Sequence, residues 1–149
     1  MEEIRYDELA KEIEKQLRKA KEIVLATCAE GRVTARLMAP LSDGLEVLMS
    51  TSVNSLKVSQ MRQNPNIALA IGNLKMEAEA ELFGHPGGHP TFLKEYAKKF
   101  PLYAKLYKSS PEDLLVIAHP KKIALYKFAG KPCEEILLPE EKWAYRLGL

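Results

Sequence analysis

Apolar positions at the start of the chain recur with the period of a helix. Leu9, Ile13, Leu17 and Ala20 follow one another at intervals of three or four residues, and charged residues fill the positions between them. A helix with this pattern buries one face and leaves the other in water. Because Lys and Glu alternate on the polar face, we expect a helix from Asp7 that covers a sheet and does not bind a membrane.

Beyond residue 22 the pattern changes to that of strands. Apolar, β-prone segments alternate with the dipeptides Glu30-Gly31 and Asp43-Gly44, which are typical of tight turns. Connections of a few residues leave no room for crossover helices, so the sheet must be largely antiparallel. We expect three strands in this part of the chain, at residues 23–28, 33–40 and 45–50.

The second half of the chain predicts further strands and two helices. Three glutamates between residues 77 and 81 alternate with apolar residues, which is typical of a strand with one solvated face. Pro101 interrupts a helical pattern over residues 91–110, so two helices should meet there. We expect strands at residues 66–72 and 76–83. Residues 114–119 and 123–128 should form a hairpin with its turn at 120–122. A last strand at 136–138 should precede a short helix that starts after Pro139.

This order of elements predicts a mainly β fold of the α+β class, an antiparallel barrel of six or seven strands with peripheral helices. The 149 residues suit a single domain, residues 1–149, whose core needs no disulfides. Cys28 and Cys133 lie far apart, and we interpret them as buried or idle thiols in a reducing compartment. No apolar segment suits a membrane span or a signal peptide, so we expect a cytoplasmic protein.

Several functional classes lack support in the sequence. The 22 basic residues nearly balance the 20 acidic ones and are scattered, which argues against nucleic-acid binding. Pro and Gly residues separate His85 from His89, and His119 has no nearby Cys or paired carboxylate, so we expect no metal site. The chain also lacks a nucleophile elbow, a Walker loop and a dinucleotide fingerprint.

The segment from Val47 to Pro65 carries the strongest candidate chemistry. It predicts a strand, a hydroxyl-rich turn and a short helix that Asn54 or Ser55 can cap. Lys57 falls in the first turn, where free backbone N–H groups and the helix dipole favour an anion such as phosphate. A capped helix with a solvated lysine is the alternative interpretation. The hydroxyl groups of this segment belong to Ser50, Thr51, Ser52 and Ser55.

Arg36 lies between apolar neighbours in the second predicted strand. A hairpin between this strand and the next would bring its guanidinium towards Ser50 and Thr51. Beside Lys57, a planar guanidinium would bind a phosphate dianion through two hydrogen bonds. The alternative interpretation is that Arg36 faces water on its strand and binds no phosphate.

The order of these motifs resembles the flavin-binding split barrels related to pyridoxamine 5′-phosphate oxidase. The resemblance covers residues 22–84 and rests on the set of motifs rather than on any one of them. In chain order they are Ala26-Thr27, Gly31, Arg36-Leu37-Met38, Asp43-Gly44, Ser50-Thr51, Ser55-Leu56-Lys57, Asn64-Pro65 and Gly84.

The resemblance implies a homodimer of split barrels with two FMN molecules at the subunit interface. By position, Arg36, Ser55 and Lys57 would bind the FMN phosphate, with Leu56 in the same motif. Ser50 and Thr51 would lie nearby. The isoalloxazine ring would run alongside Leu37, Met38 and Ala39, because a flavin ring suits a flat apolar strand surface.

Two departures from the oxidase affect the functional prediction. The chain has no counterpart of the oxidase's arginine-bearing segment for its substrate, and Glu79 stands where the oxidase has a glutamine-bearing strand. We therefore expect an FMN-dependent oxidoreductase for an unidentified small substrate, without a predicted catalytic side chain because the flavin supplies the chemistry. The alternatives are the oxidase itself, a purely structural dimer, and a non-catalytic flavin- or haem-binding module with His85, His89 or His119 as a ligand.

Overall fold

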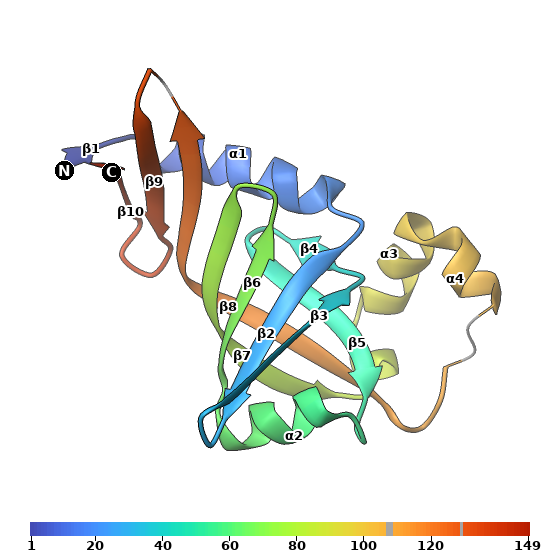
Figure 1. Ribbon diagram of the computed structural model, residues 1–149. Helices are drawn as coiled ribbons and strands as arrows, with labels where there is room; N and C mark the ends of the chain where they lie inside the picture. The colour runs from blue at the N-terminus through green and yellow to red at the C-terminus, as the bar shows by residue number, and fades with distance from the viewer. Residues whose placement is uncertain (107–108, 129) are drawn as a thin grey trace.

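One antiparallel sheet forms the body of the molecule in the computed structural model, which describes residues 1–106, 109–128 and 130–149 (Figure 1). Its strands in these residues are β1 (Glu2–Glu3), β2 (Ile23–Ala29), β3 (Arg32–Met38), β4 (Leu41–Asp43), β5 (Glu46–Ser52), β6 (Asn66–Ile71), β7 (Leu74–Gly84), β8 (Asp113–Phe128), β9 (Pro132–Leu138) and β10 (Trp143–Gly148). They pair in the order β1-β10-β9-β8-β7-β6-β2-β3, with β4 on β5 and β5 on β8. The predicted mainly β, antiparallel class is confirmed.

The long strand β8 connects the two parts of the sheet. Its first half pairs with β5 and β7, and its second half pairs with β7 and β9. The predicted turn at residues 120–122 is wrong, because Ala78 pairs with Pro120 and Glu77 with Lys122, which leaves Lys121 as a bulge. A proline lacks the N–H that a ladder needs, and a bulge is a place where strands tolerate that loss. The hairpin forms instead between β8 and β9.

The end of the chain is a strand, so the predicted helical start after Pro139 is also wrong. Residues 143–148 form β10, which pairs with β9 and places Trp143 opposite Leu138. Ala144 is buried, and the rings of Trp143 and Tyr145 lie 4.8 Å apart. Aromatic residues on alternate positions favour a strand, and pairing with β9 satisfies the backbone of the segment.

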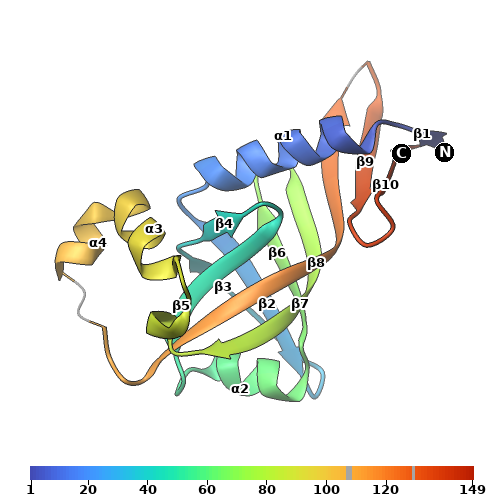
Figure 2. The same cartoon turned by 180° about the vertical axis from the view of Figure 1, so that it is seen from behind.

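The helices are arranged around the sheet. They are α1 (Tyr6–Lys19), α2 (Leu56–Gln63), α3 (Phe92–Lys99) and α4 (Pro101–Leu106), with a 3₁₀ turn, η1 (Pro86–Gly88). Helix α1 lies across one end of the barrel and α2 across the other, while α3 and α4 lie beside β4 and β5 (Figure 1; seen from behind in Figure 2). The predicted junction at Pro101 is confirmed; residues 107 and 108 of that predicted helical segment are outside the described residues. No helix in the described parts is long and apolar enough to cross a membrane.

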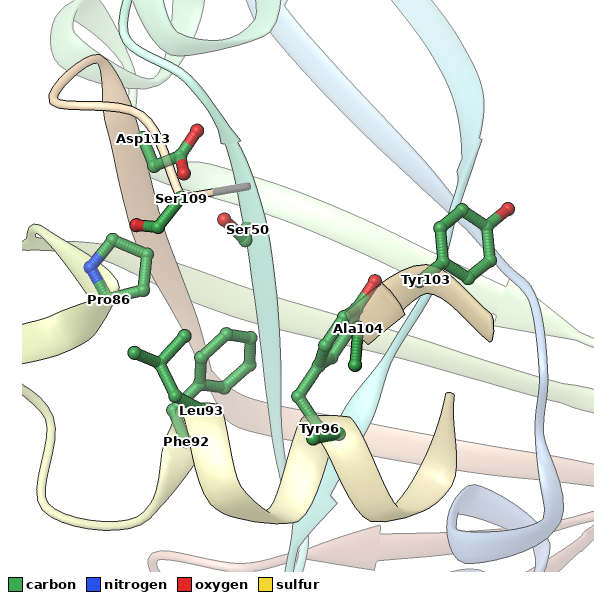
Figure 3. A pocket seen from close by; sticks show the side chains of 10 residues that line it. Ser50, Pro86, Phe92, Leu93, Tyr96, Tyr103, Ala104, Ser109 and Asp113 are labelled. Atoms are coloured by element: carbon green, nitrogen blue, oxygen red, sulfur yellow. The ribbon is translucent and has the colours of Figure 1, made fainter. Parts of the chain in front are cut away.

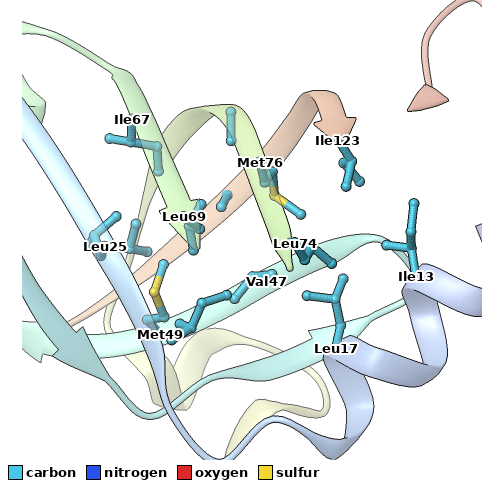
Figure 4. Packing of buried hydrophobic residues seen from close by; sticks show 14 of the residues in the cluster. Ile13, Leu17, Leu25, Val47, Met49, Ile67, Leu69, Leu74, Met76 and Ile123 are labelled. Carbon is cyan, nitrogen blue, oxygen red and sulfur yellow. The ribbon is translucent and has the colours of Figure 1, made fainter. Parts of the chain in front are cut away.

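The main core fills the space between α1 and the strands (Figure 4). Ile13 and Leu17 of α1 are fully buried against strand residues that include Leu25, Met49 and Leu74. The predicted apolar face of α1 is therefore confirmed. A second, smaller cluster lies under α3 and consists of Leu48, Phe92, Leu115 and Ile117.

The barrel is open along β3. This strand pairs with β2 through a tight turn in which Glu30 and Gly31 both have positive φ, as a two-residue hairpin of this kind requires. Its other edge has no strand partner among the described residues. Val33 and Leu37 on β3 are 69% and 63% exposed, which is unusual for two apolar side chains on one free edge.

His119 on β8 joins three strands through its ring. The ring contacts a carboxylate oxygen of Glu46 on β5 through Nδ1 and one of Glu81 on β7 through Nε2, at 2.7 Å for the second pair. The expectation that His119 has no paired carboxylate is therefore wrong, because strand pairing brings together residues far apart in the sequence. The hydrogen bond to Glu81 is the largest influence and raises the pKa of His119, although partial burial opposes the shift.

We predict that His119→Gln destabilises the protein more near pH 6 than near pH 9. A pKa raised by folding gives a stabilisation that is fully present below the unfolded-state value of about 6.5. This stabilisation is lost as the pH rises through the folded-state pKa. The side chain is 41% exposed, so solvent screening limits the effect to about 1 kcal/mol or less. Urea unfolding of both proteins at the two pH values measures it; the same difference at both would contradict the account.

Candidate anion-binding site

The start of α2 presents an uncapped helix terminus and a lysine. Ser55 occupies the predicted N-cap position, but its hydroxyl donates to the carbonyl oxygen of Ser52 at 2.8 Å and does not cap the helix. No described side chain therefore caps the backbone N–H groups of the first turn. The Nζ of Lys57, in that turn, donates to Oγ1 of Thr51 at 2.8 Å. Helix terminus, ammonium and hydroxyl together form a surface that suits an anion.

Arg36 is held in place by the β2–β3 hairpin. Its Nη1 donates to the carbonyl oxygen of Leu25 at 3.1 Å and to Oγ1 of Thr27 at 2.9 Å, and its Nη2 donates to Oγ1 of Thr34. Guanidinium has five N–H donors, and these bonds use three of them. In the described parts of the chain, the Nε–H and one Nη2–H remain free, and they form the side of the fork that can hold two oxygens of one anion.

A buried glutamine supports this arrangement from α2. Gln60 is only 4% exposed, and its Oε1 accepts hydrogen bonds from Thr27 at 2.5 Å and from Thr34 at 2.7 Å. Its Nε2 donates to the carbonyl oxygen of Arg32 at 3.1 Å. Both threonine hydroxyls therefore point their protons at Gln60 and turn their lone pairs towards Arg36. This network joins α2 to the hairpin and fixes the direction of the guanidinium.

The sequence interpretation did not include Thr27, Thr34 or Gln60 in the site. One signal was available, because the two threonines flank the Glu30-Gly31 turn symmetrically and pair directly across the hairpin. Directly paired threonines on the inner face of a hairpin can share a polar partner. Nothing in the local pattern identified Gln60 as that partner.

The two cations of the site are not neutralised by carboxylates. Partial burial lowers the pKa of Arg36; burial and, second, the positive charge of Arg36 lower the pKa of Lys57. Neither side chain forms an ion pair within the described residues. Two half-buried positive charges that repel each other are costly to hold together, and a bound dianion would remove that cost.

The predicted route by which Arg36 meets this site is wrong. Strand β3 pairs with β2, and β5 pairs with β4 and β8, so no hairpin joins Arg36 to Ser50. Thr51 contacts Lys57, whereas Ser50, the residue before it on the strand, lines a cavity on the opposite face of β5. The structure thus places Arg36, Thr51 and Lys57 at one site and turns the side chain of Ser50 away from it.

The cavity beside Ser50 has a volume of about 310 Å³ and lies between β5 and α3 (Figure 3). Apolar side chains from α3 form much of its wall, together with Tyr96. Asp113, at the start of β8, accepts a hydrogen bond from the backbone N–H of Ser110 at 2.9 Å. No Lys, Arg or His is among the described residues that line the cavity, so it does not suit an anion.

The apolar residues predicted to line a flavin ring lie at the end of β3. Leu37, Met38 and Ala39 form one wall of a groove of about 600 Å³, whose other wall is the corner between α3 and α4. Leu56, in the first turn of α2, is 45% exposed. The roles predicted for Leu37, Met38, Ala39 and Leu56 in flavin binding remain proposals.

The histidines do not form a metal centre. Among the described residues, no group of three or more His, Cys, Asp or Glu is arranged to hold a metal ion. The Nδ1 of His85 accepts from the N–H of Gly87, and the Nδ1 of His89 accepts from the N–H of Phe92 at the start of α3. These two histidines therefore support the loop before α3.

We predict that Gln60→Ala lowers the free energy of unfolding by about 1–3 kcal/mol. The buried hydroxyl of Thr27, the half-buried hydroxyl of Thr34 and the carbonyl of Arg32 each lose a hydrogen bond to Gln60. Gln63→Ala is the matched control, since Gln63 is exposed near the end of the same helix. Urea unfolding of the two variants and the wild type measures the difference. Equal stability of the two variants would show that the Gln60 network does not stabilise the fold.

Sequence comparison does not assign the chain to a protein family. No protein-family model matches it, and no match is found among curated proteins.

Solved structures match over most of the chain. A candidate pyridoxamine 5′-phosphate oxidase from Listeria innocua has a TM-score of 0.66 at 20% identity, covering 78% of this chain and 97% of its own. A pyridoxamine 5′-phosphate oxidase-related, FMN-binding protein from Nostoc punctiforme has a TM-score of 0.60 at 14% identity, covering 96% and 95%. An FAD-binding protein from Mesorhizobium loti has a TM-score of 0.61 at 13% identity, covering 76% and 91%. The chain has the split-barrel fold of the pyridoxamine 5′-phosphate oxidase-like proteins.

Proposed function

We propose that the protein binds a flavin, FMN, and acts as an oxidoreductase on a small substrate through it. The observation that carries this proposal is a pair of cations, Lys57 at the uncapped start of α2 and Arg36 of β3 beside it, with no carboxylate partner among the described residues. A phosphate monoester dianion matches both the charge and the donors of this site. Free guanidinium N–H groups, an ammonium and helix N–H groups can each take a phosphate oxygen.

The fold supports a flavin among phosphate-bearing ligands. Structures similar to this chain include an FMN-binding and an FAD-binding protein. Beyond the phosphate, the exposed surface at the end of β3 offers the apolar contacts that a flavin ring requires. The residues present therefore fit the cofactor at both its phosphate and its ring.

A bound flavin would supply electron and hydride transfer, and the chain's own residues would orient it and exclude water. Arg36 and Lys57 would hold the phosphate, while Leu37, Met38 and Ala39 would contact the ring. We assign no side chain as a catalytic acid or base, since the chemistry would take place on the cofactor.

We further propose that the functional unit is a homodimer with the flavin at the subunit interface. The outer face of β3 carries two strongly exposed apolar side chains, Val33 and Leu37, on a strand edge with no partner in the described residues. Leu56, beside the phosphate site, is also exposed. A second copy that covers this face would bury these side chains and complete the wall of the site.

Pyridoxamine 5′-phosphate oxidase activity is not favoured. Arg146, the arginine nearest the end of the chain, is paired with Glu135 at 2.7 Å and with Glu2 at 3.1 Å. It is therefore engaged within the chain and does not offer a free cation for a phosphorylated substrate.

The absorption spectrum of purified protein tests the cofactor class. We expect bands of a bound flavin, either as isolated or after FMN is added to the apoprotein. A Soret band would instead indicate haem, and a protein that remains colourless after addition of FMN would contradict the proposal.

We predict that Lys57→Met weakens FMN binding by about tenfold to a hundredfold, which corresponds to the loss of one charge-assisted hydrogen bond of about 1.5–3 kcal/mol. Arg62→Met is the matched control, because Arg62 is an exposed cation in the last turn of the same helix. Quenching of FMN fluorescence during titration of the apoprotein gives both affinities. If Lys57→Met binds FMN as tightly as Arg62→Met, the phosphate assignment is wrong.

We predict that Val33→Glu dissociates the homodimer and weakens FMN binding, since a charge on the outer face of β3 opposes burial there. Phe128→Glu is the control, because Phe128 is 70% exposed on the β8–β9 hairpin, away from β3. Sedimentation velocity of both variants shows their association state. A wild-type monomer, or a dimer that survives Val33→Glu, would contradict the proposed interface.

A further inference from the structure

A groove beside the predicted ring site carries a second pair of cations. It lies between the end of β3 and the corner where α3 meets α4, and its volume is about 600 Å³. Leu37, 63% exposed, and Tyr103, 57% exposed, offer apolar surface on its two walls, while Phe100 is 8% exposed and lies beneath two lysines. Lys21 and Lys99 also line it. The size of the groove falls in the range typical of small-molecule sites.

Lys99 is held over this groove by two contacts. Its Nζ donates to the carbonyl oxygen of Pro40 at 2.8 Å and lies 5.5 Å from the centroid of the Phe100 ring. The ammonium of Lys21 lies 5.6 Å from the same ring. Burial and, second, the charge of Lys21 lower the pKa of Lys99. The side chain is therefore partly desolvated and already positioned.

The contacts within the chain do not neutralise these charges. Neither Lys21 nor Lys99 forms an ion pair in the parts of the chain that the structure describes. Cation–π attraction to Phe100 explains the position of either lysine alone. This attraction does not remove the repulsion between the two ammonium groups at one ring. A negatively charged ligand would reduce that repulsion.

The groove also limits the charge of that ligand. Glu22 is the third charged residue among the described residues of its lining, so two positive charges and one negative charge leave an excess of one positive charge. A monoanion such as a carboxylate matches this excess better than a phosphate dianion does. The groove thus differs from the Arg36–Lys57 site, which has no carboxylate partner.

We propose that this groove binds an aromatic organic monoanion, a carboxylate or sulfonate, with its acidic group at Lys99 and Lys21 and its ring against Leu37 and Tyr103. The assignment of this molecule as the substrate rests on the proposed flavin function. Leu37, Met38 and Ala39 belong both to the groove and to the predicted ring site, and a substrate must lie beside the ring to exchange electrons with it.

The binding step can be tested on flavin-free protein with two fluorescent dyes of nearly the same shape. 1-Anilinonaphthalene-8-sulfonate is an aromatic sulfonate monoanion, and N-phenyl-1-naphthylamine is its uncharged counterpart. We expect Lys99→Met to weaken binding of the sulfonate about tenfold and to change binding of the neutral dye by less than about twofold. Lys94→Met is the matched control, because Lys94 is an exposed lysine on the same helix that does not line the groove.

Three results would overturn the groove assignment. They are equal sulfonate affinity in Lys99→Met and Lys94→Met, equal losses for both dyes, and loss of sulfonate binding in Lys57→Met but not in Lys99→Met. Lys21→Met provides a second test of the same charge if Lys99→Met does not fold. An FMN titration of the wild type separates the two proposals: sulfonate binding without FMN binding would contradict the flavin function and leave the groove assignment intact.

Discussion

The repulsion between Arg36 and Lys57 is the constraint on which the rest of the site depends. Two cations at the start of a helix are unfavourable unless something holds them there. In this protein, Thr27 and Thr34 accept hydrogen bonds from the guanidinium of Arg36. Gln60 accepts hydrogen bonds from both threonines and so joins the β2–β3 hairpin to α2. The chain thus maintains an arrangement that is costly when empty and favourable with a dianion bound.

The open barrel explains how such a site can be reached. Because β3 pairs only with β2 among the described residues, the hairpin presents one free edge near the start of α2. Strand β8 allows this opening, since its first half pairs with β5 and its second half with β9. A closed barrel would pair this edge of β3 with another strand, whereas the split leaves the edge free. Leu37, on the outer face of β3, is exposed together with the groove beside it. In the proposed homodimer, the second copy would cover this edge and complete the site.

The sequence predicted the elements whose signals are local. The apolar period of α1, the Glu30-Gly31 turn and the helix that begins after Ser55 all depend on nearby residues, and each was found in its expected place. Arg36 and Lys57 were identified as candidates from residue type and motif order.

Features that depend on pairing between residues far apart in the sequence were missed. The bulge at Lys121 was predicted as a turn because Pro120 usually ends a strand. The segment after Pro139 was predicted as a helix start, and only residues 136–138 of β9, the partner of β10, were predicted as a strand. Gln60 resembled any polar residue of a short helix, and only the fold shows that it is buried under Thr27 and Thr34.

The central claim is that this site recognises the phosphate of a flavin mononucleotide. Riboflavin carries the same ring and ribityl chain as FMN but lacks the phosphate, so a comparison of the two isolates the contribution of Arg36, Lys57 and the α2 terminus. The measurement is an equilibrium titration of the apoprotein with each compound at one ionic strength. The account predicts that FMN binds at least about a hundredfold more tightly than riboflavin, as the loss of two charge-assisted contacts implies. Equal affinities, or no binding of FMN, would contradict it.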